Sequence, residues 1–361
     1  MAKEERKQFG SSLQFILSCI GYAVGLGNIW RFPMLAYENG GGSFMIPYLT
    51  CSFMIGFPML YLELSLGQYS QSGPATVYGK MRPYAQGLGW GMAITSLLVS
   101  IYYNVIVSWV LVFIVTIFMG ESRNWALCEN YWNDQNCVSS LQNTECSEKL
   151  NLKVGEAFYF NASCYNSSSF DELKESMLQN QSATTQFFEN FILQKSDTME
   201  NFGGVNWAVF GALIFAWILT ALALSKGVKL IGKLSYITAT IPYLIIAILF
   251  VRSVTLPGAK IGLDFYLLTI DANKIFDFGP WQKAATQVCY SLAIGFGGLS
   301  SLASYNPRSH NCFRDALIIT AADGFMSIFG GTAVFSVLGF MADTQKKDIT
   351  EVVSSGTALV Y

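Results

Sequence analysis

The segment GYAVGLGN, residues 21–28, decides the fold of this chain, because it places three glycines inside a long apolar run. Glycine costs about 1 kcal/mol relative to alanine in a helix interior. The surrounding residues 8–30 contain no Asp, Glu, Lys or Arg. An apolar run of this length is typical of a membrane-spanning helix, which needs about 20 residues. The sequence therefore predicts a membrane helix that is interrupted near its middle.

Charged residues make up 13% of the 361-residue chain, and they avoid seven long segments. A soluble domain usually carries about 25% charged residues. The predicted membrane spans lie near residues 12–37, 43–70, 88–119, 206–224, 234–254, 281–305 and 316–341. The sequence thus predicts an all-α integral membrane protein. Neither the net charge of −2 nor the charge pattern indicates a nucleic-acid partner.

The short loops predict how the spans are oriented. Lys and Arg collect at the N-terminus and in the loops after spans 2, 4 and 6. Because these residues favour the cytoplasmic side, we expect a multi-pass plasma-membrane protein with a cytoplasmic N-terminus. The predicted parts are a cytoplasmic N-terminus (1–11), spans 1–3 (12–119), a large extracellular loop (120–205), spans 4–7 (206–341) and the start of another extracellular loop (342–361). The final segment EVVSSGTALVY is partly apolar, which predicts an interrupted chain.

The predicted extracellular loop carries features of a secreted segment. It holds four of the eight cysteines, and cysteines outside the cell tend to pair. Cys128 and Cys137 close a short loop and are the preferred disulfide, and spacing alone cannot decide whether Cys146 and Cys164 form a second one. Three Asn-x-Ser/Thr sequons predict glycosylation at Asn161, Asn166 and Asn180.

A second glycine cluster lies in the sixth span, in the segment SLAIGFGGLSSLASYN, residues 291–306. Unwound backbone inside a membrane is tolerated only where it lines a cavity or is buried in protein. For the first cluster, a helix-packing face formed by Gly21 and Gly25 is an alternative. Two breaks at corresponding positions of two five-helix halves favour an inverted-repeat transporter, with its binding site at the interface of the halves.

Two carboxylates lie inside predicted spans. They are Glu63 in span 2 and Asp323 in span 7, and intramembrane carboxylates are functional-site hypotheses. For Glu63 the alternative is a protonated structural acid that bridges the broken helices. Arg31 follows the first break and is expected in an outer vestibule. The one histidine, His310, is expected to be solvated in a loop, and the sequence gives no support for an enzyme.

Four segments resemble the neurotransmitter:sodium symporter family, solute carrier family 6. They are GYAVGLGNIWRFPMLAYENGGGSFMIPY (21–48), YLELSLGQY (61–69), IYYNVIVSW (101–109) and QVCYSLAIGFGGLSSLASYN (287–306). The family fold has twelve spans, with spans 1–5 and 6–10 as inverted repeats and broken helices 1 and 6. The resemblance implies that this chain holds about seven of those spans. It also implies a sodium-coupled symporter of a small zwitterionic substrate that works by alternating access.

The resemblance implies a set of site residues. The sodium ligands would be Gly21, Ala23, Val24, Asn28, Ser291 and Asp323. The chloride ligands would be Tyr48, Gln287, Ser291 and Ser327. The substrate contacts would be Ala23, Gly25, Gly27, Val99, Tyr103, Tyr290, Ala293 and Phe296. Arg31 would belong to the outer gate, and Arg6 and Tyr305 to the inner gate.

Two positions depart from well-known members of the family. Gly25 stands where monoamine carriers have Asp, which favours a neutral amino acid substrate, while carriers of GABA, glycine, taurine or betaine remain alternatives. Asp323 stands where vertebrate carriers have Asn. We hypothesise that its charge weakens chloride dependence and relaxes cation selectivity so that K⁺ is admitted, and a protonated Asp323 that mimics Asn is the alternative.

Other classes of protein agree less well with the sequence than a symporter does. A seven-span receptor would need an extracellular N-terminus, against the charge pattern, and a channel would normally be a symmetric oligomer. A truncated, non-transporting chain that regulates full-length relatives is a further alternative. The oligomeric state stays open.

Overall fold

The computed structural model describes residues 8–153, 156–160, 163–166, 181–196, 198, 200–201, 203–346 and 348–352. The chain divides into two compact units. Unit 1 contains residues up to 100 and from 220 onward, and unit 2 contains residues 101–219. The long helix α6 (Gln86–Phe118) and the helix α10 (Trp207–Leu224) each contribute residues to both units.

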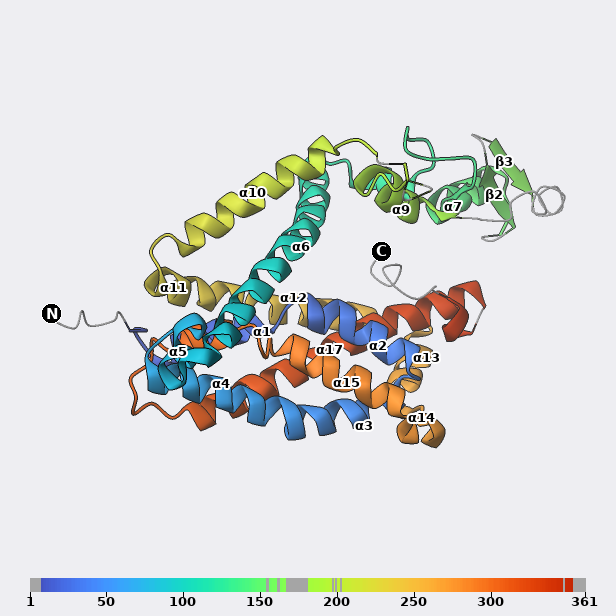
Figure 1. The fold of residues 1–361 in the computed structure, drawn as a ribbon. Coiled ribbons are helices and arrows are strands. Elements are labelled where there is room, and N and C mark those ends of the chain that lie inside the picture. Colours follow the sequence, from blue (N-terminus) through green and yellow to red (C-terminus); the bar gives the residue numbers. More distant parts are fainter. Residues whose placement is uncertain are drawn as a thin grey trace. The chain divides into compact units, whose positions relative to one another are not determined.

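Unit 1 is built from helices, many of them broken or joined by short π-helical segments (Figure 1). Its first part contains α1 (Ser12–Ala23), η1 (Gly27–Arg31), α2 (Phe32–Glu38), α3 (Gly42–Cys51), η2 (Ser52–Gly56), α4 (Phe57–Ser70), α5 (Pro74–Met81) and η3 (Pro83–Ala85). Its second part contains α11 (Val228–Thr238), α12 (Ile241–Val254), α13 (Ala259–Leu263), η6 (Asp264–Leu268), α14 (Ala272–Phe276), α15 (Phe278–Ser291), α16 (Gly298–Ala303), α17 (Cys312–Gln345) and η7 (Ile349–Glu351).

Five helices among the described residues are long and apolar enough to cross a membrane, or six if a bent pair counts as one span. The bent pair is Ser12–Ala23 with Gly27–Glu38, which meet at 50°. These helices coincide with six of the seven predicted spans. The predicted span 281–305 is not among them, because a break divides it into the short helices α15 and α16.

Among its described residues, unit 2 contains short helices and four short strands, so the chain is mostly helical and has a small amount of β-structure in this unit. The helical elements are η4 (Ser122–Ala126), α7 (Ser140–Lys149), α9 (Ala183–Gln186) and η5 (Phe187–Ile192). The strands are β1 (Cys137–Val138), β2 (Ala157–Phe160), β3 (Ser163–Asn166) and β4 (Gln181–Ser182). β1 pairs with β4 in parallel, and β2 pairs with β3 in an antiparallel ladder from Ala157 opposite Asn166 to Phe160 opposite Ser163. Hydropathy does not predict the two strand pairs, because each strand is only two to four residues long.

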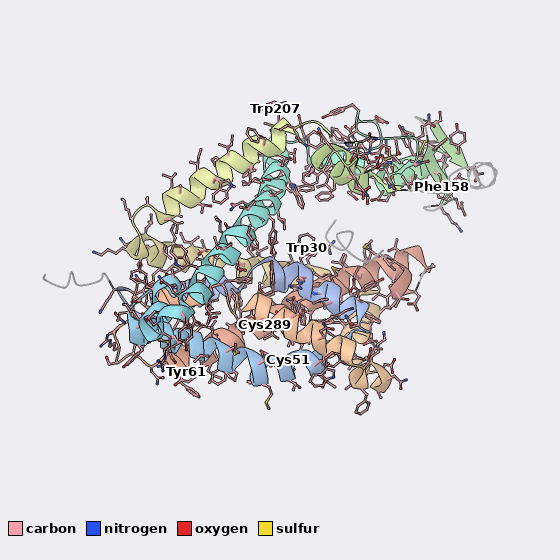
Figure 2. The ribbon with its side chains drawn as sticks, viewed as in Figure 1. Trp30, Cys51, Tyr61, Phe158, Trp207 and Cys289 are labelled. Carbon is pink, nitrogen blue, oxygen red and sulfur yellow. A yellow bond between two sulfur atoms is a disulfide. The ribbon has the colours of Figure 1, made fainter. Side chains whose placement is uncertain are left out.

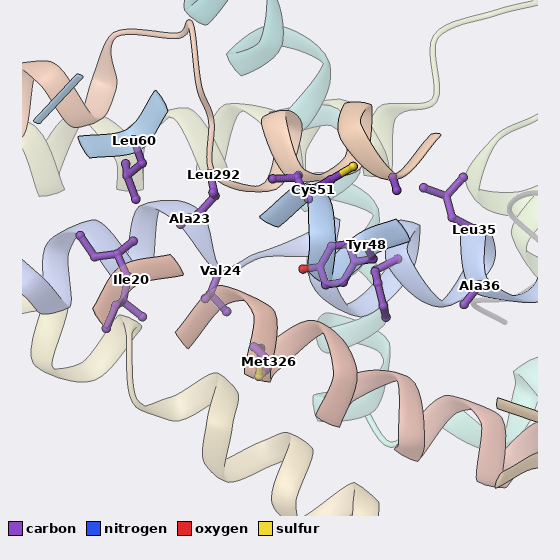
Figure 3. Close-up of a cluster of buried hydrophobic side chains, with 14 of the residues drawn as sticks. Ile20, Ala23, Val24, Leu35, Ala36, Tyr48, Cys51, Leu60, Leu292 and Met326 are labelled. Carbon is purple, nitrogen blue, oxygen red and sulfur yellow. The ribbon is translucent and has the colours of Figure 1, made fainter. Parts of the chain in front are cut away.

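Each unit has its own apolar core. In unit 1 the core runs along the broken first span and includes Ala23, Val24, Leu292 and Met326 (Figure 3). In unit 2 an aromatic cluster surrounds Phe187, which lies 5.4 Å from Phe113 between ring centroids. The free cysteines in unit 1 include Cys51 on α3 and Cys289 on α15 (Figure 2). The core of unit 1 therefore packs directly against the two helix breaks.

Candidate functional site

The interruption of the first span leaves a short non-helical gap. α1 ends at Ala23, and Val24 is extended, with φ −81° and ψ 115°. The chain resumes a helical path at Gly27 as the π-helical segment η1. Within the gap the Gly25 N–H donates to the Asn28 Oδ1 at 2.9 Å. The side chain of Asn28 therefore satisfies a backbone group that the break would leave without a partner.

Asn28 is completely buried and connects helices that are distant in sequence. Its Nδ2 lies 3.1 Å from the Ser291 Oγ, 2.7 Å from the Asp323 Oδ1 and 2.9 Å from the Ser327 Oγ. The Ser291 Oγ donates to the same Asp323 oxygen at 2.7 Å. Because an amide nitrogen carries only two hydrogens, these acceptors share them. The network ties the break in the first span to α15 and α17.

The second break lies between the end of α15 at Ser291 and the start of α16 at Gly298. Ala293 adopts a φ of +49° there, a conformation that costs a non-glycine residue roughly 1–2 kcal/mol. The Gly295 N–H donates to the Glu63 Oε1 at 2.6 Å. Glu63 is only 6% exposed. A buried carboxylate of α4 thus holds the unwound backbone of the sixth predicted span.

The residues expected to bind chloride lie beside the Asn28 network. The Tyr48 hydroxyl lies 3.0 Å from the Ser327 Oγ. The Gln287 Nε2 donates to the Gly27 carbonyl at 2.8 Å. The buried Gln287 Oε1 has no hydrogen-bond partner among the described residues. Hydroxyl and amide donors of this kind can bind an anion, although the carboxylate of Asp323 is a close neighbour.

Aromatic side chains gather at the first break. A Cβ on Gly27 would lie 3.6 Å from the Tyr290 ring, an ordinary van der Waals distance, so this ring packs beside the backbone of the first break. The Tyr290 and Phe296 rings meet edge to face, with centroids 6.2 Å apart. The Arg31 guanidinium lies 4.5 Å from the centroid of the Tyr290 ring, within range of a cation–π interaction. Arg31, Tyr290 and Phe296 therefore form one cluster that links the two broken spans.

Gly21 is placed differently from the Asn28 network. A Cβ on Gly21 would lie 3.6 Å from the Ala239 Cβ, just after α11. This is an ordinary van der Waals distance, so Gly21 packs beside the end of α11 in a place where a Cβ would also fit. Ala23 and Val24, in contrast, are buried at the break itself.

Four further predicted residues lie elsewhere. Val99 is half-buried on the part of α6 that belongs to unit 1, and Tyr103 lies on the part that belongs to unit 2. Tyr305 is half-buried just after α16. Arg6 is outside the described residues.

Unit 2 holds the predicted covalent features. Cys128 is disulfide-bonded to Cys137, and Cys146 is bonded to Cys164, the pairing that spacing left open. The sequon residue Asn166 is exposed at the end of β3. Asn161 and Asn180 lie outside the described residues.

The expectation for His310 was wrong. Its side chain is only 16% exposed, and its Nε2 lies 2.5 Å from the Asp315 Oδ2. The Asp315 side chain is 3% exposed. No pattern in the sequence indicates this pair, because the path of the loop before α17, bound by Gln68, brings the two side chains together.

The apolar helices, the broken first span and the buried polar network define a multi-pass helical membrane protein with a polar site inside its helices. The chain belongs to the sodium:neurotransmitter symporter family, whose sequence pattern matches residues 6–361. Members of this family are transporters, not enzymes.

Individual relatives agree with this assignment. The chain is 39% identical to the sodium-dependent transporter snf-5 of Caenorhabditis elegans, in a match that covers 99% of this chain and 50% of the relative. It is 38% identical to the human sodium- and chloride-dependent neutral and basic amino acid transporter B(0+), covering 99% and 56%. It is also 38% identical to the sodium- and chloride-dependent glycine transporter 2 of Xenopus laevis, covering 99% and 45%. The chain spans about half the length of the curated relatives it matches.

Proposed function

We propose that this chain forms part of a sodium-coupled symporter of neutral amino acids or related zwitterions, which works by alternating access. The observation that carries the proposal is the buried network of Asn28, Ser291 and Asp323 at the two helix breaks. Unwound carbonyls and polar side chains at such breaks are the usual ligands of a transported cation. Proteins named for sodium-dependent transport of amino acids and glycine are among its relatives.

In this proposal two sodium ions bind around the first break. The first is held by the Ala23 carbonyl and by the side chains of Asn28, Ser291 and Asp323. The second is held by the carbonyls of Gly21 and Val24. A carboxylate among the ligands of the first ion adds attraction for a cation in a site that is almost closed to solvent, since Asp323 is 2% exposed.

The substrate would lie beside the first sodium ion. Its carboxylate would meet the N–H groups of the break, the sodium ion and the Tyr103 hydroxyl, while the aromatic rings of Tyr290 and Phe296 would cover its apolar part. Gly25 leaves room for that carboxylate, because it adds no side chain to the gap. The further contacts would be Ala23, Gly27, Val99 and Ala293. Since each ligand stabilises the site for the other, sodium and substrate would bind cooperatively.

Chloride would bind weakly at Tyr48, Gln287, Ser291 and Ser327. These side chains supply hydrogen-bond donors, but an ionised Asp323 would repel an anion there. The same extra charge would relax the discrimination between Na⁺ and K⁺.

The membrane arrangement is part of the proposal. The N-terminus would be cytoplasmic, and residues 120–205 would form a glycosylated extracellular loop. Arg31, stacked over Tyr290, would close the outer side of the site. Arg6 and Tyr305 would close the inner side.

Uptake of radiolabelled neutral amino acids tests the proposal. Cells that express the protein should accumulate the label in sodium medium and lose most of this uptake in choline medium. Asn28→Ala should abolish the sodium-dependent part. Asn39→Ala is the matched control, because Asn39 is also buried but bonds to the Leu35 carbonyl, away from the network. Equal uptake in both media, or normal uptake by Asn28→Ala, would contradict the proposal.

A further inference from the structure

Two cysteines of unit 1 lie on neighbouring helices and carry free thiols. Cys51 is the last residue of α3 and is 5% exposed. Cys289 is half-buried and lies in the last turn of α15, which ends at Ser291 (Figure 2). Neither thiol is among the groups proposed to bind ions or substrate, so both are nucleophiles without an assigned role.

The segments that carry these thiols pack closely at Gly56, which ends the π-helical segment η2 directly after α3. A Cβ on Gly56 would lie 2.6 Å from the Val288 Cγ1 and 2.9 Å from the Leu292 Cδ1, so these side chains of α15 would have to move. The Cys51 carbonyl oxygen lies 3.9 Å from the same Cβ position. Because Val288 directly precedes Cys289, the backbone of Cys51 and the last turn of α15 meet at this glycine.

The two thiols are close enough for an electrostatic interaction with each other. A disulfide needs Cα atoms about 4.4–6.8 Å apart. Membrane helices approach each other closely where a small residue such as glycine lies between them. Cys312, which is also half-buried, has a different neighbour, because the Ser65 hydroxyl lies 3.5 Å from its sulfur. Cys51 and Cys289 are therefore a candidate pair for a disulfide between α3 and α15.

The two thiols differ in exposure, which sets the order in which they react. The half-buried Cys289 can meet a small, uncharged oxidant, whereas Cys51 is almost closed to one. Redox-sensitive cysteines are often accessible thiols that lie beside a second, resolving cysteine. Apolar surroundings slow the attack of a thiol, because the thiolate is the nucleophile, so we expect a slow oxidation. Cys289 would react first, and Cys51 would resolve the product.

We propose that Cys51 and Cys289 form a redox site, in which hydrogen peroxide joins the two thiols into a disulfide between α3 and α15. The Cys289 sulfur attacks one peroxide oxygen, the O–O bond breaks, and water leaves with the thiol proton, which gives a sulfenic acid. The Cys51 sulfur then attacks the Cys289 sulfur, the S–O bond breaks, and a second water leaves with the Cys51 proton. Two electrons and two protons thus pass from the thiols to the peroxide, which becomes two waters.

The redox site lies next to residues of the proposed transport site. Cys289 directly precedes Tyr290 and Ser291, which are proposed to contact the substrate and sodium. A disulfide to Cys51 would restrict the last turn of α15 at that place. The oxidation itself does not depend on the symporter proposal, because it requires only the two thiols and the peroxide.

Peptide mass spectrometry tests the redox site without any need for uptake or sodium. The full chain in membranes is treated with hydrogen peroxide, the remaining thiols are blocked with N-ethylmaleimide in denaturant, and the protein is digested without reductant. A linked peptide that holds residues 51 and 289 should appear, and the free-thiol forms of both peptides should fall by equal amounts. Dithiothreitol should restore both thiols. Since the readout does not depend on transport, it can fail or succeed independently of the symporter proposal.

Two serine variants and one other cysteine separate a specific pair from random oxidation. Cys51→Ser should leave Cys289 unlinked and open to further oxidation to a sulfinic acid. Cys289→Ser should leave Cys51 reduced, because no accessible thiol then starts the reaction. Cys312 is the matched control for exposure and should enter no linked peptide. The proposal is overturned if Cys51 and Cys289 both stay free after treatment, if Cys289 is recovered only as a sulfinic acid, or if Cys312 is linked to either thiol as often as they are linked to each other.

Discussion

At Asp323 a single substitution can change the charge of the proposed ion site while the size of the side chain stays the same. Asp323→Asn removes one negative charge and keeps the side chain's size. Its remaining oxygen can still accept from Asn28 and Ser291, as the Asp323 Oδ1 does at 2.7 Å from each partner. The substitution therefore tests charge rather than packing.

The magnitude follows from the geometry of the network. Bonds of 2.7 Å and 2.9 Å join the Asp323 Oδ1 and the Ser327 Oγ to the same Asn28 nitrogen. An anion held at Ser327 would lie roughly 6 Å from the carboxylate, where two unit charges repel by about 3 kcal/mol at an effective dielectric constant of about 20. Removing the charge should therefore strengthen chloride binding by about 100-fold.

The assay is thermal unfolding of the purified protein at constant sodium, while chloride replaces gluconate. A ligand that binds the folded state raises the unfolding midpoint with its concentration. The unsubstituted protein should respond weakly to chloride, and Asp323→Asn should respond at a concentration about 100-fold lower. Asp343→Asn is the matched control, because it makes the same charge change on the same helix at a residue that pairs with Lys346. Coincident chloride titrations of the unsubstituted protein and Asp323→Asn would refute the reasoning and favour a protonated Asp323.

Three further predictions concern stability. Glu63→Ala should lower the unfolding midpoint, because the Gly295 N–H loses its acceptor, at a cost of about 1–3 kcal/mol. Gly67→Ala should prevent recovery of folded protein, measured as the monodisperse fraction in size-exclusion chromatography, because the new Cβ would lie 2.1 Å from the Ser300 carbonyl oxygen. Cys164→Ser should speed proteolysis within unit 2, because a disulfide between cysteines 18 residues apart contributes about 3 kcal/mol.

Each of these predictions has its own control. Glu63→Gln keeps an acceptor and should unfold later than Glu63→Ala, and equal midpoints would count against the hydrogen bond. Gly211→Ala in α10 places a Cβ with no neighbour within 4 Å, so it should be recovered normally, and poor recovery of both glycine variants would remove the steric explanation. Added reductant should abolish the difference between Cys164→Ser and the unsubstituted protein.

The hydropathy of the chain was enough to predict most of the apolar helices, because lipid exposure imposes long uncharged runs. It was not enough for residues 281–305, where the break shortens both halves below the length of a span. The glycine clusters predicted both breaks, since glycine at positive φ, as at Gly295, leaves a helix easily. The resemblance to the family placed Asn28 and Asp323 in one site, and their side chains are hydrogen-bonded although the two residues are 295 positions apart. Their ion-binding roles stay predictions.

Other features depend on contacts that no periodicity encodes. The pair of His310 and Asp315 requires a loop path that Gln68 sets from another helix. The bond between Cys146 and Cys164 requires the folding of α7 against β2 and β3. In both cases no sequence pattern marks the two partners, and only the folded path of the chain brings them together.

The most direct test of the central claim is equilibrium binding of a labelled neutral amino acid to the purified protein, measured in sodium and in choline at equal ionic strength. If the network of Asn28, Ser291 and Asp323 holds a sodium ion beside the substrate, sodium should lower the dissociation constant, and Ser291→Ala should remove most of that effect. A dissociation constant that is the same in sodium and choline, in a protein that does bind the amino acid, would contradict the account.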